Sequence, residues 1–192
     1  MLSFTRLTLF AALALAASAN PLGAITARTS STCTTVKTTD VTVGSNTVVL
    51  SSLSCDSTAS VTLAPVAAAT NDTNVCGEIC NTFCSGQGSL PPITQDCQVI
   101  TEAITLFEGN QSPTFTVQPF HIVQLVFGTC RFFFENLSGA PIDYCWQDLS
   151  NTGSAVATTC FPPTQPVESL AECKSPDGTW ELGVSHSNNT SS

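Results

Sequence analysis

Aromatic and acidic side chains occur together at two places in the sequence, a combination that suits sugar binding. Tyr144 and Trp146 stand beside Asp148, and Asp177 stands just before Trp180. Aromatic faces pack against the C–H faces of sugar rings, and carboxylates accept hydrogen bonds from sugar hydroxyls. These five residues are our candidate ligand-binding residues. The competing interpretation is that the rings fill the core, where large aromatic side chains are usually found.

Catalysis finds less support in the sequence. A hydrolase needs a nucleophile with a base, or two carboxylates in one cleft. The only histidines are His121 and His186, and no Gly-x-Ser-x-Gly segment occurs. Asp96 and Asp143 are expected at helix starts, where an acid interacts favourably with the helix dipole. We therefore predict no enzymatic activity and no cofactor.

Ten cysteines, an even number, indicate disulfide bonds in an oxidising compartment. Cys33 and Cys55 bracket a predicted hairpin and are the pair we expect first, while the other pairings stay open. A metal site at Cys76-x3-Cys80-x3-Cys84 is disfavoured because no second ligand pair stands nearby. The predicted disulfide cysteines are Cys33, Cys55, Cys76, Cys80, Cys84, Cys97, Cys130, Cys145, Cys160 and Cys173.

The first residues read as a secretory leader. Arg6 precedes an apolar run that ends in Ala17-Ser18-Ala19, small residues of the kind that a signal peptidase recognises. The run is shorter than the roughly 20 apolar residues that span a bilayer. We therefore predict a signal peptide over residues 1–19, no membrane span, and a secreted, extracellular protein.

The charge of the chain limits its partners. The formal net charge is −9, and loss of Arg6 with the leader would lower it by one. The other strong bases are Arg28, Lys37, Arg131 and Lys174, and they are not clustered. Nucleic acids and anionic membranes both need clustered cations, so neither is expected as a partner. The hydroxyl-rich composition instead favours an extracellular glycan or a cell-surface or wall component.

Five asparagines stand in glycosylation sequons, and Pro113 is expected to weaken the one at Asn110. The other four are the predicted sites: Asn71, Asn136, Asn188 and Asn189. We predict that some of these carry glycans in a secreted glycoprotein. The alternative is chance occurrence in a chain rich in Ser, Thr and Asn.

Composition divides the remaining chain into segments. Residues 20–32 and 188–192 are small and polar and are predicted to be disordered. Residues 33–55 form two β-branched runs around Gly44-Ser45-Asn46, which predicts a β-hairpin module. Residues 56–75 read as a linker, and residues 76–187 as a disulfide-rich domain.

Periodicity predicts the elements of that domain. A helix begins after Pro91-Pro92 with Ile93, Cys97, Ile100, Ile104 and Phe107 on one face. Strands follow at 114–117 and 122–136, the latter kinked at Gly128. A second helix is expected from about Tyr144 to Thr159, weakened by Gly153, and a last strand at 179–184. The predicted fold is α+β: an antiparallel sheet with two helices on one face.

Alternation along residues 131–134 turns Phe132 and Phe134 to one side of the strand and Arg131 and Phe133 to the other. One of these sides must face the core.

The block 76–187 resembles small secreted cysteine-rich proteins of mushroom-forming (basidiomycete) fungi. The segments that carry the resemblance are PITQDC (92–97), TFTV (114–117), GTCRFFF (128–134), DYCWQD (143–148) and WEL (180–182). The chain is more distantly similar to fungal necrosis-inducing extracellular effectors, to killer-toxin-like proteins and to a mushroom glycan-binding family. The resemblance implies an α/β sandwich and a non-enzymatic secreted role. Killer toxins tend to be basic, and this chain departs from them in being acidic.

These observations predict a secreted, non-enzymatic, effector-like or glycan-binding protein. The alternatives are a structural protein of the cell wall and a toxin-like effector that acts on other cells.

Overall fold

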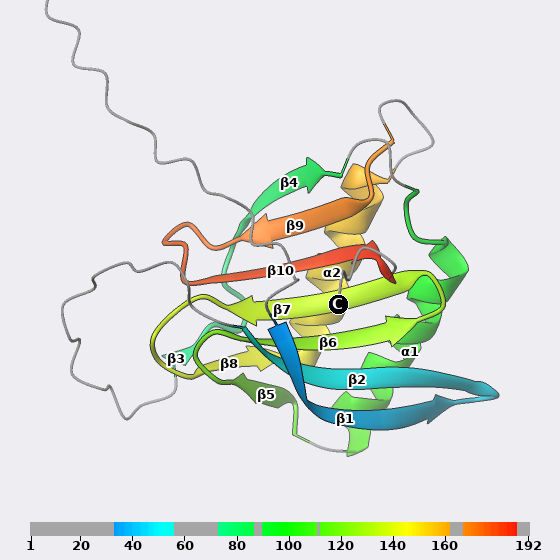
Figure 1. Ribbon diagram of the computed structural model, residues 1–192, viewed down its shortest axis with the longest axis horizontal. Coiled ribbons are helices and arrows are strands. Elements are labelled where there is room, and N and C mark those ends of the chain that lie inside the picture. Colours follow the sequence, from blue (N-terminus) through cyan, green and yellow to red (C-terminus); the bar gives the residue numbers. More distant parts are fainter. Residues whose placement is uncertain (1–32, 56–72, 87–89, 111, 162–166, 188–192) are drawn as a thin grey trace, which may run out of the picture.

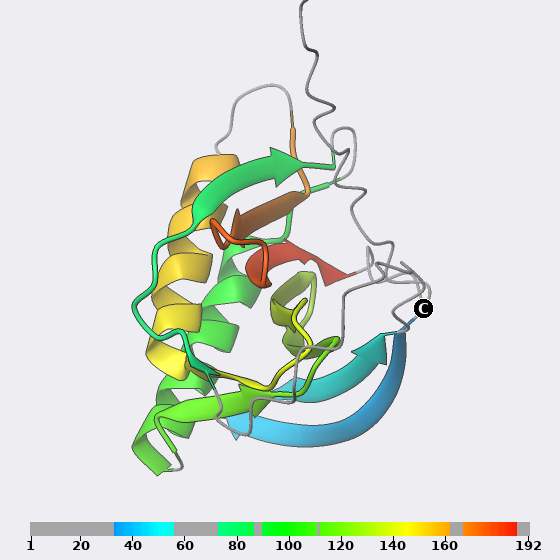
Figure 2. The same ribbon diagram turned by 90° about the vertical axis from the view of Figure 1, so that its left-hand side faces the viewer.

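The computed structural model describes residues 33–55, 73–86, 90–110, 112–161 and 167–187. These residues form a seven-stranded sheet, a three-stranded sheet and two helices, and both helices pack on one face of the larger sheet (Figures 1 and 2). The predicted α+β fold with an N-terminal hairpin is confirmed. The predicted leader, lead-in and tail lie outside the described residues, as do residues 56–72 of the predicted linker.

The N-terminal hairpin forms one edge of the larger sheet. Its strands are β1 (Cys33–Val43) and β2 (Asn46–Cys55), and the turn between them uses Gly44 at a φ of 57°, which favours glycine. Strand β2 also pairs antiparallel with β6 (His121–Phe127). The hairpin is therefore continuous with the sheet of the domain, and is not a module set apart from it.

The rest of the larger sheet comes from strands far apart in the sequence. Its order is β1-β2-β6-β7-β10-β9-β4, with β7 (Cys130–Asn136), β10 (Trp180–His186), β9 (Leu170–Lys174) and β4 (Asn81–Ser85). Every neighbouring pair is antiparallel. The sequence predicted β6, β7 and β10, and placed the bend between β6 and β7 at Gly128, which has a φ of 53°.

A small sheet lies beside the large one, with β3 (Thr73–Asn74) and β5 (Thr114–Val117) on either side of β8 (Ile142–Cys145). Strand β5 was predicted with these bounds. The start of the second helix was predicted wrongly, because Tyr144 belongs to β8. Asp143 is also in β8, where its carboxylate accepts a hydrogen bond from the Thr116 hydroxyl, and the N-cap of the helix is Cys145.

The two helices bury one face each against the sheet. Helix α1 (Thr94–Asn110) buries Ile100, Ala103, Ile104 and Phe107, close to the predicted face, although Ile93 lies before the helix and is exposed. Helix α2 (Trp146–Cys160) buries Trp146, Leu149, Gly153, Val156 and Cys160. The core fills the space between these faces and the sheet.

All ten cysteines are paired in five disulfides, and the predicted Cys33–Cys55 bond is one of them. The others are Cys76–Cys145, Cys80–Cys173, Cys84–Cys160 and Cys97–Cys130. Cys97–Cys130 joins α1 to β7, and Cys84–Cys160 joins β4 to the end of α2, so each helix is bound covalently to the sheet.

Candidate functional site

The predicted sugar-binding aromatics lie in the core. Trp180 and Tyr144 are at most 1% exposed, and Trp146 is 5% exposed. The Trp180 indole N–H points to the Glu78 carboxylate at 3.4 Å. A ligand cannot stack on these rings without opening the protein, so the prediction that they form a ligand-binding surface is wrong.

These rings instead stabilise the core by packing on one another. Phe134 stacks on Tyr144 with a centroid distance of 4.4 Å and on Trp180 at 5.6 Å. Trp146 packs against Phe115 at 4.1 Å and Phe107 at 4.8 Å. Such aromatic contacts add to the free energy gained by burial. The cluster therefore joins β7, β8, β10 and both helices.

Asp148 and Asp177, which we predicted to bind a ligand together with these aromatics, stabilise the backbone near them. Asp148 accepts a hydrogen bond from the Gly77 N–H at 2.7 Å, which ties α2 to the segment after β3. Asp177 is exposed in the turn before β10 and accepts bonds from the Thr179 N–H and hydroxyl. These bonds lower the pKa of Asp177, because they favour its charged form.

Of the four predicted glycosylation sites, Asn136 lies among the described residues and is buried. Asn136 is 0% exposed, and its side-chain nitrogen donates to the carbonyl oxygens of Val117 at 2.9 Å and Ala140 at 2.8 Å. A glycan on this nitrogen does not fit the folded protein, so the prediction that Asn136 carries one is contradicted. Asn71, Asn188 and Asn189 lie outside the described residues.

The strongest candidate site is on the face of the seven-stranded sheet that is turned away from α1 and α2, which we call the helix-free face. Strand alternation and register place a row of charged side chains across it: Glu135 lies opposite Glu181, and Glu181 lies opposite Lys174. Glu172 is two residues before Lys174 on β9 and shares its face, and Arg131 lies opposite Ser185. The predicted alternation of Arg131 and Phe133 against Phe132 and Phe134 is confirmed.

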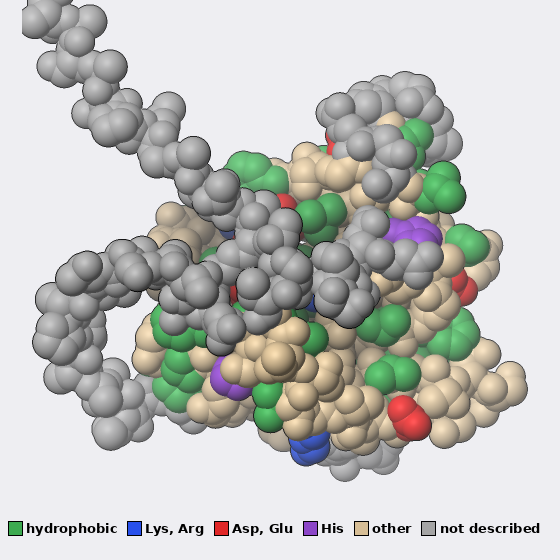
Figure 3. Space-filling model, in the orientation of Figure 1, with side chains coloured by type: hydrophobic (Ala, Val, Ile, Leu, Met, Phe, Trp, Pro, Cys, Tyr) green, Lys and Arg blue, Asp and Glu red, His purple; other side chains and the backbone are tan. Residues whose placement is uncertain are grey.

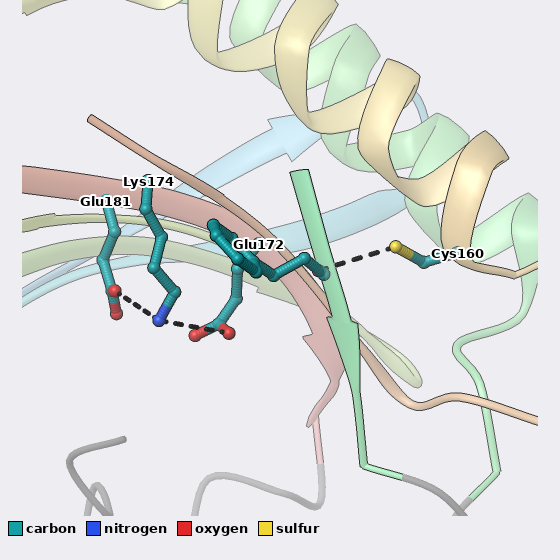
Figure 4. Close-up of polar contacts among 5 residues, drawn as sticks. Cys160, Glu172, Lys174 and Glu181 are labelled. Carbon is teal, nitrogen blue, oxygen red and sulfur yellow. Dashed lines mark hydrogen bonds and ion pairs between the residues drawn. The ribbon is translucent and has the colours of Figure 1, made fainter. Parts of the chain in front are cut away.

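A lysine joins two carboxylates in this row. The Lys174 ammonium is 3.0 Å from Glu181 Oε2 and 3.4 Å from Glu172 Oε2, and Figure 4 shows it between the two acids. Burial raises the pKa of Glu172, and the negative charge of Glu181 raises it further. Burial alone would lower the pKa of Lys174, but the two carboxylates raise it above its ordinary value. All three side chains are therefore held in one geometry.

Arg131 is engaged within the protein. Its Nε donates to Gln124 Oε1 at 2.6 Å, and Gln124 Nε2 donates to Ser51 Oγ at 3.0 Å. Its guanidinium lies 4.5 Å from the centroid of the Phe133 ring. Burial lowers the pKa of Arg131 to about 10, although Glu135 and Glu181 oppose that shift. This polar chain links β7 to β6 and β2.

An exposed aromatic ring borders the charged row. Phe83 on the edge strand β4 lies opposite Glu172 and is 48% exposed. The Lys174 ammonium is 5.9 Å from its ring centroid. The Cys84–Cys160 disulfide and the approach of the Cys160 sulfur to the Phe83 carbonyl oxygen hold this strand against α2 (Figure 4). We call Phe83, Glu172, Lys174 and Glu181 the edge site.

The sequence-based reasoning missed this site because it did not predict β4 and β9. A signal was available: Leu170-Ala171-Glu172-Cys173-Lys174 alternates, with Ala171 and Cys173 buried in the core and the acid and base on the other face. The aromatic residue of the site, Phe83, is one of eleven phenylalanines in the chain, so its residue type alone did not distinguish it.

Figure 3 views the helix-free face, and few charged side chains are visible in the part of it that the grey atoms leave open. Such a surface suits hydroxyl-rich partners better than polyelectrolytes.

The described residues offer one further grouping of possible metal ligands, which is Cys76, Cys145 and Asp148. Both sulfurs belong to one disulfide, and a metal-binding cysteine must be a thiolate. This grouping therefore does not supply a zinc-type ligand set.

In the part of the chain that the structure describes, no helix has the length and hydrophobicity needed to cross a membrane. Comparisons with protein-family models, with curated proteins and with solved structures found no match for the chain.

Proposed function

We propose that this chain is a secreted, non-enzymatic binding protein that holds an extracellular glycan, or a similar hydroxyl-rich component of a cell surface or wall, at the edge site. The observation that carries the proposal is the exposed Phe83 ring beside two carboxylates that one lysine holds in place. Five disulfides and a leader-like N-terminal sequence support secretion.

The edge site offers both kinds of contact that a sugar needs. The exposed face of Phe83 can pack against the C–H face of a pyranose ring. Glu172 is buried and serves to hold Lys174, whereas the Glu181 side chain is 14% exposed. The ion pair uses one oxygen of the Glu181 carboxylate, which has further lone pairs that can accept hydrogen bonds from hydroxyls. Because Lys174 already fixes both acids, little side-chain entropy is lost when a ligand binds.

The position of Lys174 favours binding over hydrolysis. Glycosidases also use two carboxylates, but they hold the scissile bond, or a water molecule, in the space between them. Here the lysine ammonium lies between Glu172 and Glu181. The two acids therefore face a cation of the protein and act as fixed acceptors.

A glycan array probed with the purified mature protein tests this proposal, followed by calorimetry on the best ligand. Phe83→Ala should weaken binding about tenfold, or about 1.4 kcal/mol, whereas Phe83→Trp should retain it. Ile93→Ala is the matched control, because Ile93 is about as exposed as Phe83 but precedes α1.

Three results would count against a non-enzymatic binding role at the edge site. Saturable binding that survives Phe83→Ala would place the ligand elsewhere on the molecule. If no glycan on the array were bound, one of the alternatives would be favoured. Retention of the protein in the wall fraction would then indicate a structural protein, and cell damage by the pure protein would indicate a toxin-like effector. Turnover of a glycoside panel would show an enzyme.

A further inference from the structure

We propose that the helix-free face is a docking surface for a segment of this chain, residues 20–32, which crosses it from Cys33. Three features point to this occupant: the place where the chain enters the sheet, the length of the segment and its residue types. The inference does not depend on the proposed function, because it concerns the middle of the helix-free face and not the edge site.

An apolar cluster lies on the helix-free face. Its members all belong to strands of the seven-stranded sheet: Cys33, Leu53, Cys55, Ile122, Phe133 and Leu170. Both helices pack on the opposite face (Figure 2), so the described residues supply no second layer for this cluster. Ile122 and Phe133 are nevertheless only 4% exposed each, and an apolar sheet face is stably buried only against another layer. That layer therefore has to come from residues outside the described ranges.

The chain enters the sheet beside this cluster. Cys33 begins β1, packs against the cluster and is bonded to Cys55. Phe133 lies on β7, three strands from β1, which is about 14 Å at the usual strand spacing. About four or five extended residues span that distance. The thirteen residues of 20–32 are therefore long enough to cross the cluster.

The segment carries apolar residues that suit the cluster. Leu22 and Ile25 precede Cys33 by eleven and eight residues, so both can reach it. Residues 188–192, which follow the last strand, are Asn, Thr and Ser and offer no side chain of this kind. Composition predicts disorder for residues 20–32, but burying two apolar side chains against this cluster favours an ordered path.

Charge complementarity supports the same path. Arg28 is the only strong base of the segment and stands five residues before Cys33, about 17 Å in an extended chain. Glu135 on β7 and Glu181 on β10 lie opposite each other on the helix-free face, three and four strands from β1. An arginine that crosses the face there can form hydrogen bonds with carboxylates, and such bonds are stronger where little water reaches them.

The exposure of two phenylalanines fits a segment that covers part of the face. Phe133, Gly183, Glu172 and Phe83 lie opposite one another in one row across β7, β10, β9 and β4. Phe133 is 4% exposed, whereas Phe83 is 48% exposed. A segment that crosses from Cys33 covers the first ring and leaves the second, at the far edge of the sheet, open.

Hydrogen–deuterium exchange of the purified mature protein tests the inference. Backbone amides of residues 24–32 should exchange at least about tenfold more slowly than in a free peptide of the same sequence, because docking protects them. Residues 188–192 are the internal standard and should exchange at the rate of a free peptide. Equal rates in the two segments would overturn the inference.

Variants connect this protection with the face. Deletion of residues 20–32 should expose the cluster and raise the fluorescence of a hydrophobic dye at least about threefold, whereas deletion of residues 188–192 should not change it. Arg28→Gln should reduce the protection of residues 24–32 by a factor of about three to ten. Lys37→Gln is the matched control, because Lys37 is exposed on β1. The exchange measurement on the unaltered protein does not depend on the folding of any variant.

Three further outcomes would overturn the inference and leave the proposed function untouched. Dye fluorescence that both deletions leave unchanged would show that the cluster needs no cover from residues 20–32. Protection that Lys37→Gln reduces as much as Arg28→Gln would show a general effect of charge. Protection that grows with protein concentration, together with dimers in analytical ultracentrifugation, would show that a second copy of the chain covers the face.

Discussion

Single side chains in this protein have roles that residue type alone does not reveal. Both tryptophans and the tyrosine looked like a binding surface, yet they are the centre of the core. In a small domain the largest apolar side chains are needed inside, because few other residues bury as much area. Among the residues that the structure describes, the exposed aromatic ring is that of Phe83, one of the least distinctive aromatics in the sequence.

Asn136 illustrates a polar side chain with a structural role. Asn136→Ala should destabilise the fold by about 1–3 kcal/mol, because it removes a buried amide that donates to the carbonyl oxygens of Val117 and Ala140, of which the Ala140 oxygen keeps the Ser138 hydroxyl as a donor. Asn151→Ala, on the exposed side of α2, should change the free energy of unfolding by less than about 0.5 kcal/mol. Denaturant unfolding measures both. Similar values for the two variants would show that the Asn136 amide contributes little.

Lys174 gives a prediction about pH. The pKa of Lys174 is raised in the folded protein. The stabilisation that Lys174 provides is therefore fully present below the ordinary pKa of a lysine, and it is lost as the pH rises through the folded pKa. The raised pKa of Glu172 acts in the same direction, because the fold disfavours its charged form and stability falls as Glu172 ionises with rising pH. Lys174→Met removes the cation that offsets this ionisation, so the variant should lose more stability at about pH 8 than at about pH 4.

Thermal unfolding of the Lys174→Met variant across this pH range checks the prediction. Lys37→Met is the control, since Lys37 is exposed on β1 and its loss changes the net charge equally. A deficit that grows toward acid pH in Lys174→Met would contradict the assignment of the ion pairs.

At the scale of elements, periodicity predicted the helices and the strands that alternate strongly, which are β5, β6, β7 and β10. It did not predict β4, β8 and β9, whose register is set by partners distant in sequence. Strand β9 pairs with both β4 and β10. Local alternation could have indicated β9 itself, but the edge site depends on the pairing of β9 with β4 and β10, which local patterns do not reveal.

Gly153 shows why the sequence signal for α2 was weak. Glycine lowers helix propensity, but a Cβ at Gly153 would lie 2.5 Å from the Phe132 ring of β7. Gly153→Ala should therefore destabilise the protein by about 1–3 kcal/mol through overpacking, in spite of the better propensity of alanine. Thr158→Ala on the exposed side of the same helix should be neutral or slightly stabilising.

Denaturant unfolding of the two α2 variants gives the comparison. Stabilisation of the Gly153→Ala variant would mean that the helix shifts away from the sheet at little cost, and that this close contact between α2 and β7 is not required.

At the scale of the whole molecule, covalent bonds join elements that local sequence signals cannot bring together. Cys80–Cys173 and Cys84–Cys160 connect the β4 region to β9 and α2, with sequence separations of 93 and 76 residues. Cys33–Cys55 closes a hairpin with a separation of only 22 residues. The first two bonds therefore restrict the unfolded chain more strongly than the third.

This difference predicts an order of stabilities. Replacing Cys80 and Cys173 together by serine should cost about 1.3 kcal/mol more than replacing Cys33 and Cys55, because the entropy of closing a loop grows with its length. Strand β2 stays paired with β6 in the second variant, so the hairpin should remain on the sheet. Denaturant unfolding measures the two free energies, and glycan binding should fall in the first variant alone because β4 carries Phe83. If removing Cys33–Cys55 cost more free energy of unfolding than removing Cys80–Cys173, the bond at the open end of the hairpin would contribute more to stability than the bond that closes the longer loop.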